Sequence, residues 1–474
     1  MSAGAHRSEQ DSAHRPSPAQ GSAGPANGAR DSANRDAASS DIVGRGSRDG
    51  ARLMRDWFAS LTQASREGRK AAFVFVMGNM NEVLRTFDLP IVFPEVTALQ
   101  TAVRGTSEGY LKEAEDYGFS PDVCGYVKAD IAMHLRGGEH PMGLIPKPGL
   151  VVTTNACNTY FKWAEIWERL YEAPVVTIDI PNDRACGPRS MPGDKNFKYE
   201  LSYVVTQVKE LIAACEQVTG KKFDIDKFRE HLGYANTMSR YWKRLLALNE
   251  RTPAVYNALT DGLAFLGMAN CFRATKEGAD YFRDLYEEME YRSDHGIGSM
   301  TRKDGKDVPV EQRFRLGLLG VPCYPIFRGF SEFFTDWGGV FVISSYLKFA
   351  SGGTALGYEF DLDNPIESFA EGSLLTVRET QQGLLFDFPD IESKFSPYKL
   401  DGIVYHGVKS CRTASSGLAD RRYHTSERLG LPTLLLESDI VDPRAVSKAQ
   451  MKNRTDAFFE GLIARKQKSL AAGH

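Results

Sequence analysis

The chain has 474 residues, of which 42% are hydrophobic and 25% charged, and its formal net charge is only −3. This length supports two or three domains, and this composition is that of ordinary globular cores. The near-neutral balance and the lack of a basic run argue against a nucleic-acid-binding protein. No apolar run is long enough to span a bilayer, and the start of the chain lacks the apolar core of a signal peptide. We therefore expect a cytoplasmic protein that binds neither nucleic acid nor membrane.

The first 50 residues consist mainly of Ala, Gly, Ser, Arg and Asp, with almost no large apolar side chain. Such a segment cannot bury enough surface to offset its ordering entropy, so we expect a disordered head over residues 1–50. A transit peptide would also be rich in arginine, but it would be poor in acids. The acids of this segment therefore argue against one: Glu9, Asp11, Asp31, Asp36 and Asp41.

Residues 51–196 alternate between helical and strand patterns. Four short apolar runs predict buried strands: "AAFVFVMG", "LPIVFPEV", "GLVVTTN" and "PVVTIDIP". Amphipathic segments such as "TYFKWAEIWERLYE" separate them and predict helices. Alternating strands and helices favour a parallel sheet with helices on both faces, so we predict an N-terminal α/β domain here.

Residues 197–310 carry four long helical periodicities, and we predict a helical region there. Alternation resumes over 311–474 with the runs "RFRLGLLGVP", "GGVFVIS", "DGIVYHG" and "PTLLLESD" and a last helix from about residue 444 to 466. Both ends of the chain repeat the order strand, thiol, helix, strand, which indicates a distant internal duplication. We therefore expect an α/β protein with two Rossmann-like parallel-sheet domains that flank a cleft, and a helical region between them.

Seven cysteines stand at positions 124, 157, 186, 215, 271, 323 and 411. No CxxC pair exists and the count is odd, which argues against a zinc ribbon, a thioredoxin motif and a disulfide framework. Cys215 and Cys271 lie inside helical patterns, where free cysteine is usually a packing residue. Cys186 and Cys323 lie on predicted turns, and each is either a spare ligand or loop filler.

Cys124, Cys157 and Cys411 share one predicted position, the start of a helix. Cys124 follows Ser120 and Pro121, which suit a helix cap and first turn, and the other two each follow a strand. Free N–H groups and the helix dipole favour a thiolate there. Three thiolates on a four-iron cube would leave one iron open for substrate or water. Spacing alone does not separate this hypothesis from three buried thiols, which is the common role of free cysteine.

Several motifs are absent: the P-loop, the dinucleotide G-x-G-x-x-G, H-E-x-x-H and G-x-S-x-G. The nine histidines have no paired spacing that indicates a metal site. If redox chemistry takes place here, we expect its electrons to come from another protein.

Four stretches together resemble a known family: "GYVKADIAMHLRGG", "TTNACNTYFKWAEIWERLY", "DGIVYHGVKSC" and "LLLESDIVDPRAVSKAQMKNRTDAFFE". The chain from about residue 70 onward is similar to the benzoyl-CoA reductase and 2-hydroxyacyl-CoA dehydratase family, and residues 78–181 resemble its ATP-dependent B-type subunits most. The resemblance implies a 4Fe–4S cluster held by Cys124, Cys157 and Cys411. It also implies a related cluster-bearing subunit, ATP-hydrolysing activator subunits that deliver electrons, and an acyl-CoA substrate.

We therefore expect an iron–sulfur subunit of an ATP-driven aromatic acyl-CoA reductase, which dearomatises benzoyl-CoA or an analogue through a ketyl-like radical. That radical needs donors at its oxygen and a proton for the ring. The candidate groups at strand or helix ends are His406, Glu437 and Lys128, with Asp439 and Tyr126 beside them. For His406 a core histidine bonded to backbone is an equal alternative. For Glu437 and Asp439 the alternative is a cap of the helix near Pro443, and for Asp439 this alternative is at least as strong as a catalytic role. Tyr160, Trp163 and Trp167 are spaced to pack on the sheet.

Two other functions remain open on the sequence. One is a 2-hydroxyacyl-CoA dehydratase subunit, which has the same architecture but recycles its electron. The other is a cluster-bearing relay subunit whose partner holds the active site.

Overall fold

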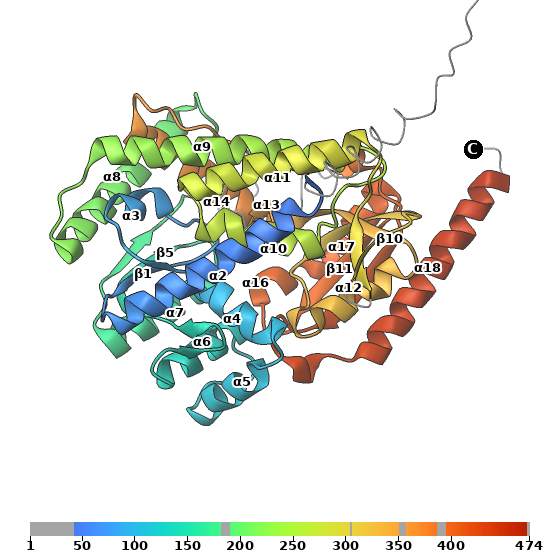
Figure 1. Cartoon of the computed structure of the whole chain (residues 1–474), viewed down its shortest axis with the longest axis horizontal. Coiled ribbons are helices and arrows are strands. Elements are labelled where there is room, and N and C mark those ends of the chain that lie inside the picture. Colours follow the sequence, from blue (N-terminus) through green and yellow to red (C-terminus); the bar gives the residue numbers. More distant parts are fainter. Residues whose placement is uncertain (1–41, 182–189, 304–305, 350–356, 386–394, 472–474) are drawn as a thin grey trace, which may run out of the picture. The chain divides into compact units, whose positions relative to one another are not determined.

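Two four-stranded parallel sheets organise the part of the chain that the structure describes. The computed structural model describes residues 42–181, 190–303, 306–349, 357–385 and 395–471. Helices alternate with the strands of both sheets (Figure 1). This arrangement confirms the predicted α/β class with two parallel-sheet regions.

The first sheet has the strand order β2-β1-β5-β6. Its strands are β1 (Ala71–Val74), β2 (Ile91–Val92), β5 (Pro148–Thr154) and β6 (Val175–Ile178), and every pairing is parallel. All seven residues of the central strand β5 are buried, as expected for a strand covered on both faces. Each strand lies inside one of the four apolar runs of residues 51–196 to within one residue, so those predictions are confirmed.

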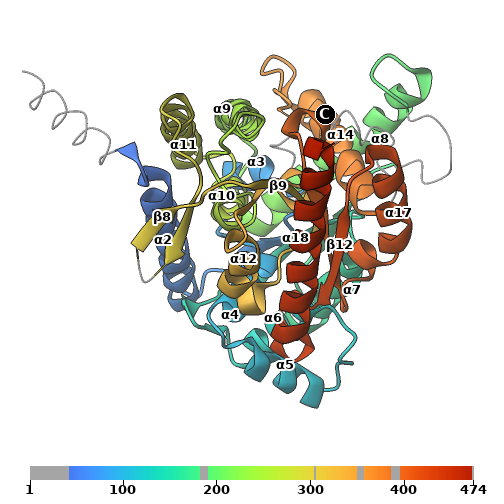
Figure 2. The same ribbon diagram turned by 90° about the vertical axis from the view of Figure 1, so that its right-hand side faces the viewer.

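The second sheet has the order β10-β9-β11-β12 and is parallel throughout. Its strands are β9 (Phe314–Gly320), β10 (Gly339–Ser344), β11 (Gly402–Val408) and β12 (Thr433–Ser438). The helices α12 (Phe327–Thr335), α17 (Leu418–Leu429) and α18 (Lys448–Ala471) accompany it, and α18 runs alongside the edge strand β12 (Figure 2). The four predicted strands of this region are confirmed.

Four long helices lie between the sheets in the chain: α8 (Lys195–Thr219), α9 (Ile225–Leu248), α10 (Thr260–Cys271) and α11 (Lys276–Asp294). The Asp224 carboxylate caps α9 by accepting the N–H groups of Asp226 and Lys227, and the Thr275 hydroxyl caps α11. Between these helices the buried Trp242 ring meets Phe282 edge to face at 5.1 Å. The predicted helical region is therefore present. Two short antiparallel hairpins were not predicted: β3 (Glu139–His140) with β4 (Gly143–Leu144), and β7 (Met300–Lys303) with β8 (Lys306–Pro309).

The helix α2 (Arg45–Arg66) begins inside the segment that composition predicts to be disordered. Residues 1–41 of that segment lie outside the described residues, but the prediction is wrong for residues 45–50. The reason is a contact from far along the chain: the Glu288 carboxylate accepts the N–H groups of Gly44 and Gly46, both at 2.7 Å. A Cβ atom on Gly46 would come within 2.3 Å of Leu285, so only glycine allows α2 to lie this close to α11.

The remaining helices place the functional residues or connect the two regions. They are α3 (Asn81–Thr86), α4 (Pro94–Val103), α5 (Ser107–Asp116), α6 (Gly125–Leu135), α7 (Asn158–Tyr171), α13 (Ser345–Phe349), α14 (Pro365–Leu385) and α16 (Arg412–Ser415), with the 3₁₀ turns η1 (Tyr324–Ile326), η3 (Ser396–Tyr398) and η4 (Pro443–Ala445). Contacts of α4 with η1 and of α5 with η4 join the N-terminal and C-terminal regions.

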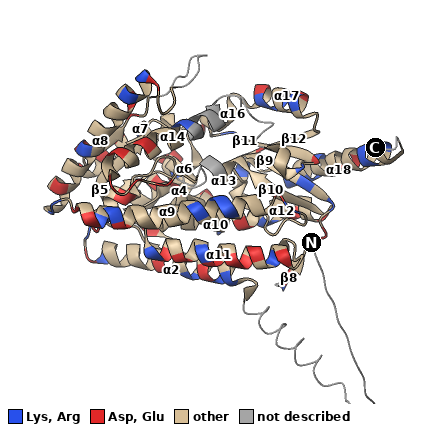
Figure 3. Ribbon diagram, turned by 90° about the horizontal axis from the view of Figure 1, so that it is seen from above, with Lys and Arg blue, Asp and Glu red and all other residues tan. Residues whose placement is uncertain are grey.

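Charged side chains of both signs are interspersed along α2 and α11 (Figure 3). This mixture agrees with the small net charge of the chain and does not form a single-sign surface on these helices. Within the described residues, none of the helices combines the length and the apolar character that a membrane span requires.

Candidate functional site

Three cysteines occupy the N-cap position of three different helices. Cys124 precedes α6, Cys157 precedes α7, and Cys411 precedes α16. Cys157 and Cys411 follow the carboxyl ends of β5 and β11, one in each sheet. The prediction that each thiol stands at a helix start is therefore confirmed. The helix after Cys124 begins at Gly125 and not at Pro121, so Cys124 caps this helix and does not lie in its first turn. The carboxyl edges of the two sheets supply the other two thiols.

The loops that carry these cysteines contact one another. The Gly125 N–H donates to the Ser410 hydroxyl at 3.3 Å, which joins the Cys124 and Cys411 loops. The Cys157 sulfur lies 3.6 Å from the Thr413 hydroxyl, which joins the Cys157 loop to α16. A Cβ atom on Gly125 would lie 3.0 Å from Val441 and 3.1 Å from Asp439, so the glycine permits this close approach. The three loops thus meet, although they come from distant parts of the chain.

The thiols also affect one another's pKa. Burial raises the pKa of Cys124, and the nearby Cys411 and Cys157 raise it further. Burial and then Cys157 raise the pKa of Cys411 to about 12, and burial also raises the pKa of Cys157. Backbone N–H groups of the following helices act in the opposite direction at each sulfur, from Tyr126, Thr159 and Ala414. Each thiol therefore faces donors that suit a thiolate, but three buried charges repel one another unless a cation joins them.

None of the other cysteines that the structure describes belongs to this group. Cys215 and Cys271 are buried within α8 and α10, as predicted for packing residues. Cys323 is buried and accepts a hydrogen bond from the Ser438 hydroxyl, and Cys186 lies outside the described residues. Within the described ranges, no three His, Cys, Asp or Glu side chains form a site for a single metal ion.

His406 lies in the core of the second sheet, on β11. Its Nδ1 bonds the Val321 carbonyl and its Nε2 lies 2.6 Å from the Ser438 hydroxyl, so both ring nitrogens are used within the protein. Burial lowers the pKa of His406, which keeps the ring neutral. These contacts favour the structural alternative for this histidine over a proton donor.

Lys128 is also buried, one helical turn after Cys124. Its ammonium group donates to the Pro121 carbonyl at 2.7 Å and to the Glu115 carboxylate at 2.8 Å. Arg444 first and Lys128 second lower the pKa of Glu115 to about 2, against its desolvation. Lys128 therefore holds the turn that leads into Cys124, which is a positioning role.

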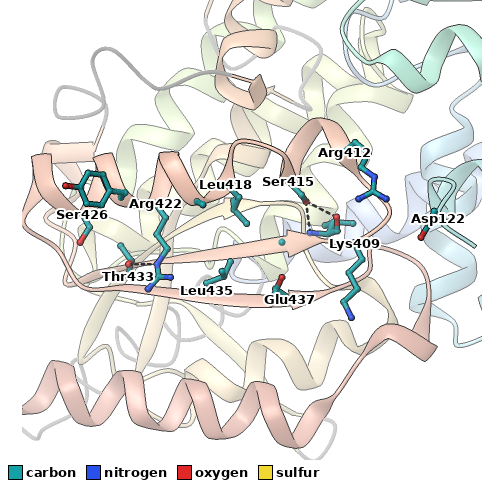
Figure 4. Close-up of a pocket in the computed structure, with 14 residues that line it drawn as sticks. Asp122, Lys409, Arg412, Ser415, Leu418, Arg422, Ser426, Thr433, Leu435 and Glu437 are labelled. Atoms are coloured by element: carbon teal, nitrogen blue, oxygen red, sulfur yellow. Dashed lines mark hydrogen bonds between the residues drawn. The ribbon is translucent and has the colours of Figure 1, made fainter.

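Glu437 is exposed on β12 and lines a pocket of about 700 Å³ beside Cys411 (Figure 4). Asp439, two residues later, is buried and accepts N–H groups of Ser410, Val441 and Asp442. Asp439 thus shapes the loop of Cys411, whereas the cap of the turn at Pro443 is Asp442. The predicted alternative of Asp439 as that cap is wrong, because the Asp442 carboxylate, and not that of Asp439, accepts the N–H group of Arg444 in this turn.

Comparison with known proteins now adds to this geometry. The sequence profile of a family described as 2-hydroxyglutaryl-CoA dehydratase, D-component, matches residues 80–462. The chain belongs to this family. It is 34% identical to the B subunit of benzoyl-CoA reductase from Thauera aromatica, over 84% of this chain and 90% of that protein. It is 26% identical to the (R)-2-hydroxyisocaproyl-CoA dehydratase alpha subunit of Clostridioides difficile, over 88% and 95%. It is also 26% identical to the (R)-phenyllactyl-CoA dehydratase alpha subunit of Clostridium sporogenes, over 81% and 88%.

In this member of the 2-hydroxyglutaryl-CoA dehydratase family, a further titratable group lies beside the thiols. Glu95, in the first turn of α4, is buried and accepts hydrogen bonds from the Val76 N–H and the Tyr160 hydroxyl. Burial raises its pKa to about 7. Its charge reaches Cys157, whose pKa it raises, and the phenol of Tyr126. Glu95 is therefore a buried carboxyl with a raised pKa that interacts electrostatically with Cys157.

Glu95 was not among the residues predicted from the sequence, although one signal was present. The acid is the only charged residue of the run "LPIVFPEV" and comes three residues after β2 ends, at the carboxyl edge where ligands bind in such sheets. The aromatic helix face was predicted correctly: Tyr160, Trp163 and Trp167 are all buried, and Tyr160 stacks on Phe75 at 3.9 Å.

Proposed function

We propose that this chain is the iron–sulfur subunit of an ATP-driven aromatic acyl-CoA reductase, acting on benzoyl-CoA or a close analogue. The observation that carries the proposal is that Cys124, Cys157 and Cys411 lie at three helix starts on loops that contact one another, and that Cys157 and Cys411 raise the pKa of Cys124. The 34% identity to a benzoyl-CoA reductase subunit supports the substrate class. Because the relatives are named as subunits, we infer that this chain also works with a related subunit. We further propose that an ATP-hydrolysing activator delivers its electrons and that the complex works in the cytoplasm.

The donor set fits a 4Fe–4S cluster better than a single ion. Each thiolate of such a cluster binds a different iron, so the sulfurs surround the cluster and need not meet at one point. The raised pKa values of the three thiols mean that they hold their protons in the absence of a cation, and bound iron would favour the thiolates. When bound, the cluster would supply single electrons of low potential, and its fourth iron would lack a cysteine from this trio.

The residues of the chain supply the proton chemistry and the positioning. A ring that accepts an electron must also accept a proton, and the donor should have a pKa near the working pH. We propose that Glu95 holds that proton at its carboxyl, because its pKa of about 7 leaves it partly protonated and the Tyr160 hydroxyl orients it. Lys128 and Asp439 position the loops of Cys124 and Cys411. The exposed Glu437 remains a second proton-donor candidate from its pocket beside Cys411.

A 2-hydroxyacyl-CoA dehydratase subunit is the second candidate, since several relatives with 24–26% identity carry that name. Turnover separates the two functions. A reductase consumes reductant and ATP in proportion to product, whereas a dehydratase needs only a catalytic amount of both. A relay role is the third candidate, and it predicts that product forms only in the partner subunit.

The experiment is anaerobic purification of the chain with its partner subunit, followed by iron and acid-labile sulfide analysis and by assay with benzoyl-CoA, ATP and reductant. We expect about four irons and four sulfides in this subunit, as its three thiolates suit one cubane cluster. An iron-free preparation that still turns over the thioester would overturn the proposal. Product formation without continuous reductant consumption would favour the dehydratase.

A further inference from the structure

We propose that the pocket between β11, β12 and α17 binds the phosphate groups of a coenzyme A thioester through Lys409, Arg412 and Arg422 (Figure 4). The proposal rests on the proposed function for its substrate class. It adds the residues that hold the polar end of the substrate, which neither the thiols nor Glu95 explain.

The pocket has the size and position of a ligand site. Its volume of about 700 Å³ lies within the range of about 300 to 1,000 Å³ that is typical of small-molecule pockets. It opens beside the carboxyl end of β11, where Gly407, Val408 and Lys409 line it. Cys411 lies between Lys409 and Arg412 in the chain, so the pocket borders the loop that carries Cys411.

The cations of the pocket are available to an anion. Lys409 and Arg412 are exposed, and neither side chain forms an ion pair or a hydrogen bond with any residue that the structure describes. Arg422 donates its Nε–H to the Thr433 hydroxyl at 2.9 Å, which fixes the guanidinium against β12. Arginine presents a planar group that binds phosphate through two parallel hydrogen bonds, and lysine adds a compact charge.

The cations lie at the two ends of the pocket, and coenzyme A carries two separate phosphate groups. Lys409 and Arg412 lie at the end near Asp122, and Arg422 lies with Thr433 at the other end (Figure 4). Coenzyme A carries a diphosphate that leads into its thioester arm and a separate 3′-phosphate on the ribose. We assign the diphosphate to Lys409 and Arg412 and the 3′-phosphate to Arg422.

Two carboxylates also line the pocket, Asp122 and Glu437. They would repel a small polyanion such as pyrophosphate, whose atoms are all acceptors. Coenzyme A also carries donors, namely the adenine amino group, the ribose hydroxyl and the amide N–H groups of its arm. Carboxylate oxygens accept hydrogen bonds from such groups, so the mixed lining favours coenzyme A over an inorganic anion.

The test is calorimetric titration of the full-length chain with three probes: coenzyme A, dephospho-coenzyme A, which lacks the 3′-phosphate, and pyrophosphate. The variants are Lys409→Gln with Arg412→Gln, Arg422→Gln, and the control Arg428→Gln on the same helix α17 but outside the pocket lining. We expect the double variant to bind coenzyme A and dephospho-coenzyme A about tenfold more weakly or worse, because the loss of one charged hydrogen bond lowers affinity by about that factor. Arg422→Gln should weaken coenzyme A to a similar extent and leave dephospho-coenzyme A unchanged, and Arg422→Lys should restore part of the loss.

Other outcomes overturn the proposal. If the affinity for coenzyme A is the same in all variants, the pocket is not its binding site. If Arg422→Gln weakens the binding of coenzyme A and dephospho-coenzyme A equally, Arg422 does not bind the 3′-phosphate. Pyrophosphate binding as tight as that of coenzyme A would indicate a general anion site. The titration needs neither iron nor reductant, so it is independent of the proposed function. A chain that binds coenzyme A in this pattern, but is iron-free and active when purified anaerobically with its partner subunit, refutes the iron–sulfur reductase and keeps the pocket. If the protein is an active iron–sulfur reductase but its affinity for coenzyme A is the same in all variants, the proposed function stands and the pocket is refuted. Unchanged circular dichroism confirms that each variant is folded.

Discussion

The Cys157 sulfur lies 3.6 Å from the Thr413 hydroxyl, although the two residues are 256 positions apart in the chain. Cys157 follows a strand of the first sheet and Thr413 lies in the helix that follows a strand of the second. This single contact joins the carboxyl edges of both sheets. It also places the thiol site where residues from both halves of the chain act together.

Removal of any one of the three thiols should remove the proposed cluster. We expect Cys124→Ser, Cys157→Ser and Cys411→Ser each to lose most of the iron and sulfide and all detectable reductase activity, because a serine hydroxyl is a poor ligand for this soft site. Iron analysis and absorption spectroscopy under anaerobic conditions measure the loss. Cys215→Ala is the matched control: this cysteine is buried in α8, so its variant should keep full iron content. Equal iron in all four variants would contradict the proposed ligands.

The Thr413 hydroxyl should lower the pKa of the Cys157 thiol. It lowers the pKa of Cys157 against the larger effect of burial, so Thr413→Val should raise that pKa and slow alkylation of Cys157 in the cluster-free protein. The rate of modification by iodoacetamide as a function of pH, followed by mass spectrometry at Cys157, measures this. Thr206→Val is the control, since that hydroxyl bonds its own helix far from the thiols. An unchanged rate for Cys157 would show that the contact has no electrostatic effect.

Glu95 should make the protein less stable as the pH rises. Burial raises its folded pKa to about 7 from an unfolded value of 4.5, so the folded state binds the extra proton between these values. Stability then falls as the pH rises through this window, by at most about 3 kcal/mol for a shift of this size. Glu95→Gln should remain about as stable as wild type at pH 5 and become more stable than it at pH 8, in urea unfolding at both values. A constant difference between the two proteins at both pH values would show that Glu95 does not titrate in this range.

Lys128 should affect stability and cluster retention together. Lys128→Met leaves the Pro121 carbonyl without its buried donor and should cost about 2 to 4 kcal/mol, because the lost partners include a charged group. The turn that carries Cys124 then loosens, so iron content should fall as well. Lys112→Met removes an exposed pair with Glu108 and should cost under about 0.5 kcal/mol. Urea unfolding and iron analysis give both readouts. If Lys128→Met keeps wild-type stability and iron content but has no activity, Lys128 is catalytic and not only a positioning residue.

His406 should behave as a core residue. His406→Gln disturbs hydrogen bonds to Val321 and Ser438 and should destabilise the protein by about 1 to 3 kcal/mol. The pH dependence of activity should keep its wild-type shape, since a buried neutral imidazole with both nitrogens bonded exchanges no proton with substrate. Activity measured from pH 6 to 8 tests this. If His406→Gln loses the acidic or the alkaline limb of the pH–activity profile, His406 is a proton donor.

The elements of this protein were readable from local patterns. Eight apolar runs became the eight strands of the two parallel sheets, and three cysteines predicted at helix starts are N-caps. These features depend on residues within a few positions of one another, such as an apolar run that ends before a helical periodicity. The family resemblance added the expectation that the three thiols meet, which spacing alone left open.

Only the tertiary structure decided which polar groups are buried and which contact one another. The start of α2 depends on Glu288, which lies more than 240 residues away. The raised pKa of Glu95 depends on burial beside Tyr160, and the roles of Lys128 and His406 depend on their carbonyl partners. Burial and long-range contacts set the desolvation and hydrogen bonding of a side chain, and neither is encoded in the residues next to it. For that reason the sequence by itself determined the positions of the thiols along the chain, and the packing of the two sheets determined what surrounds them.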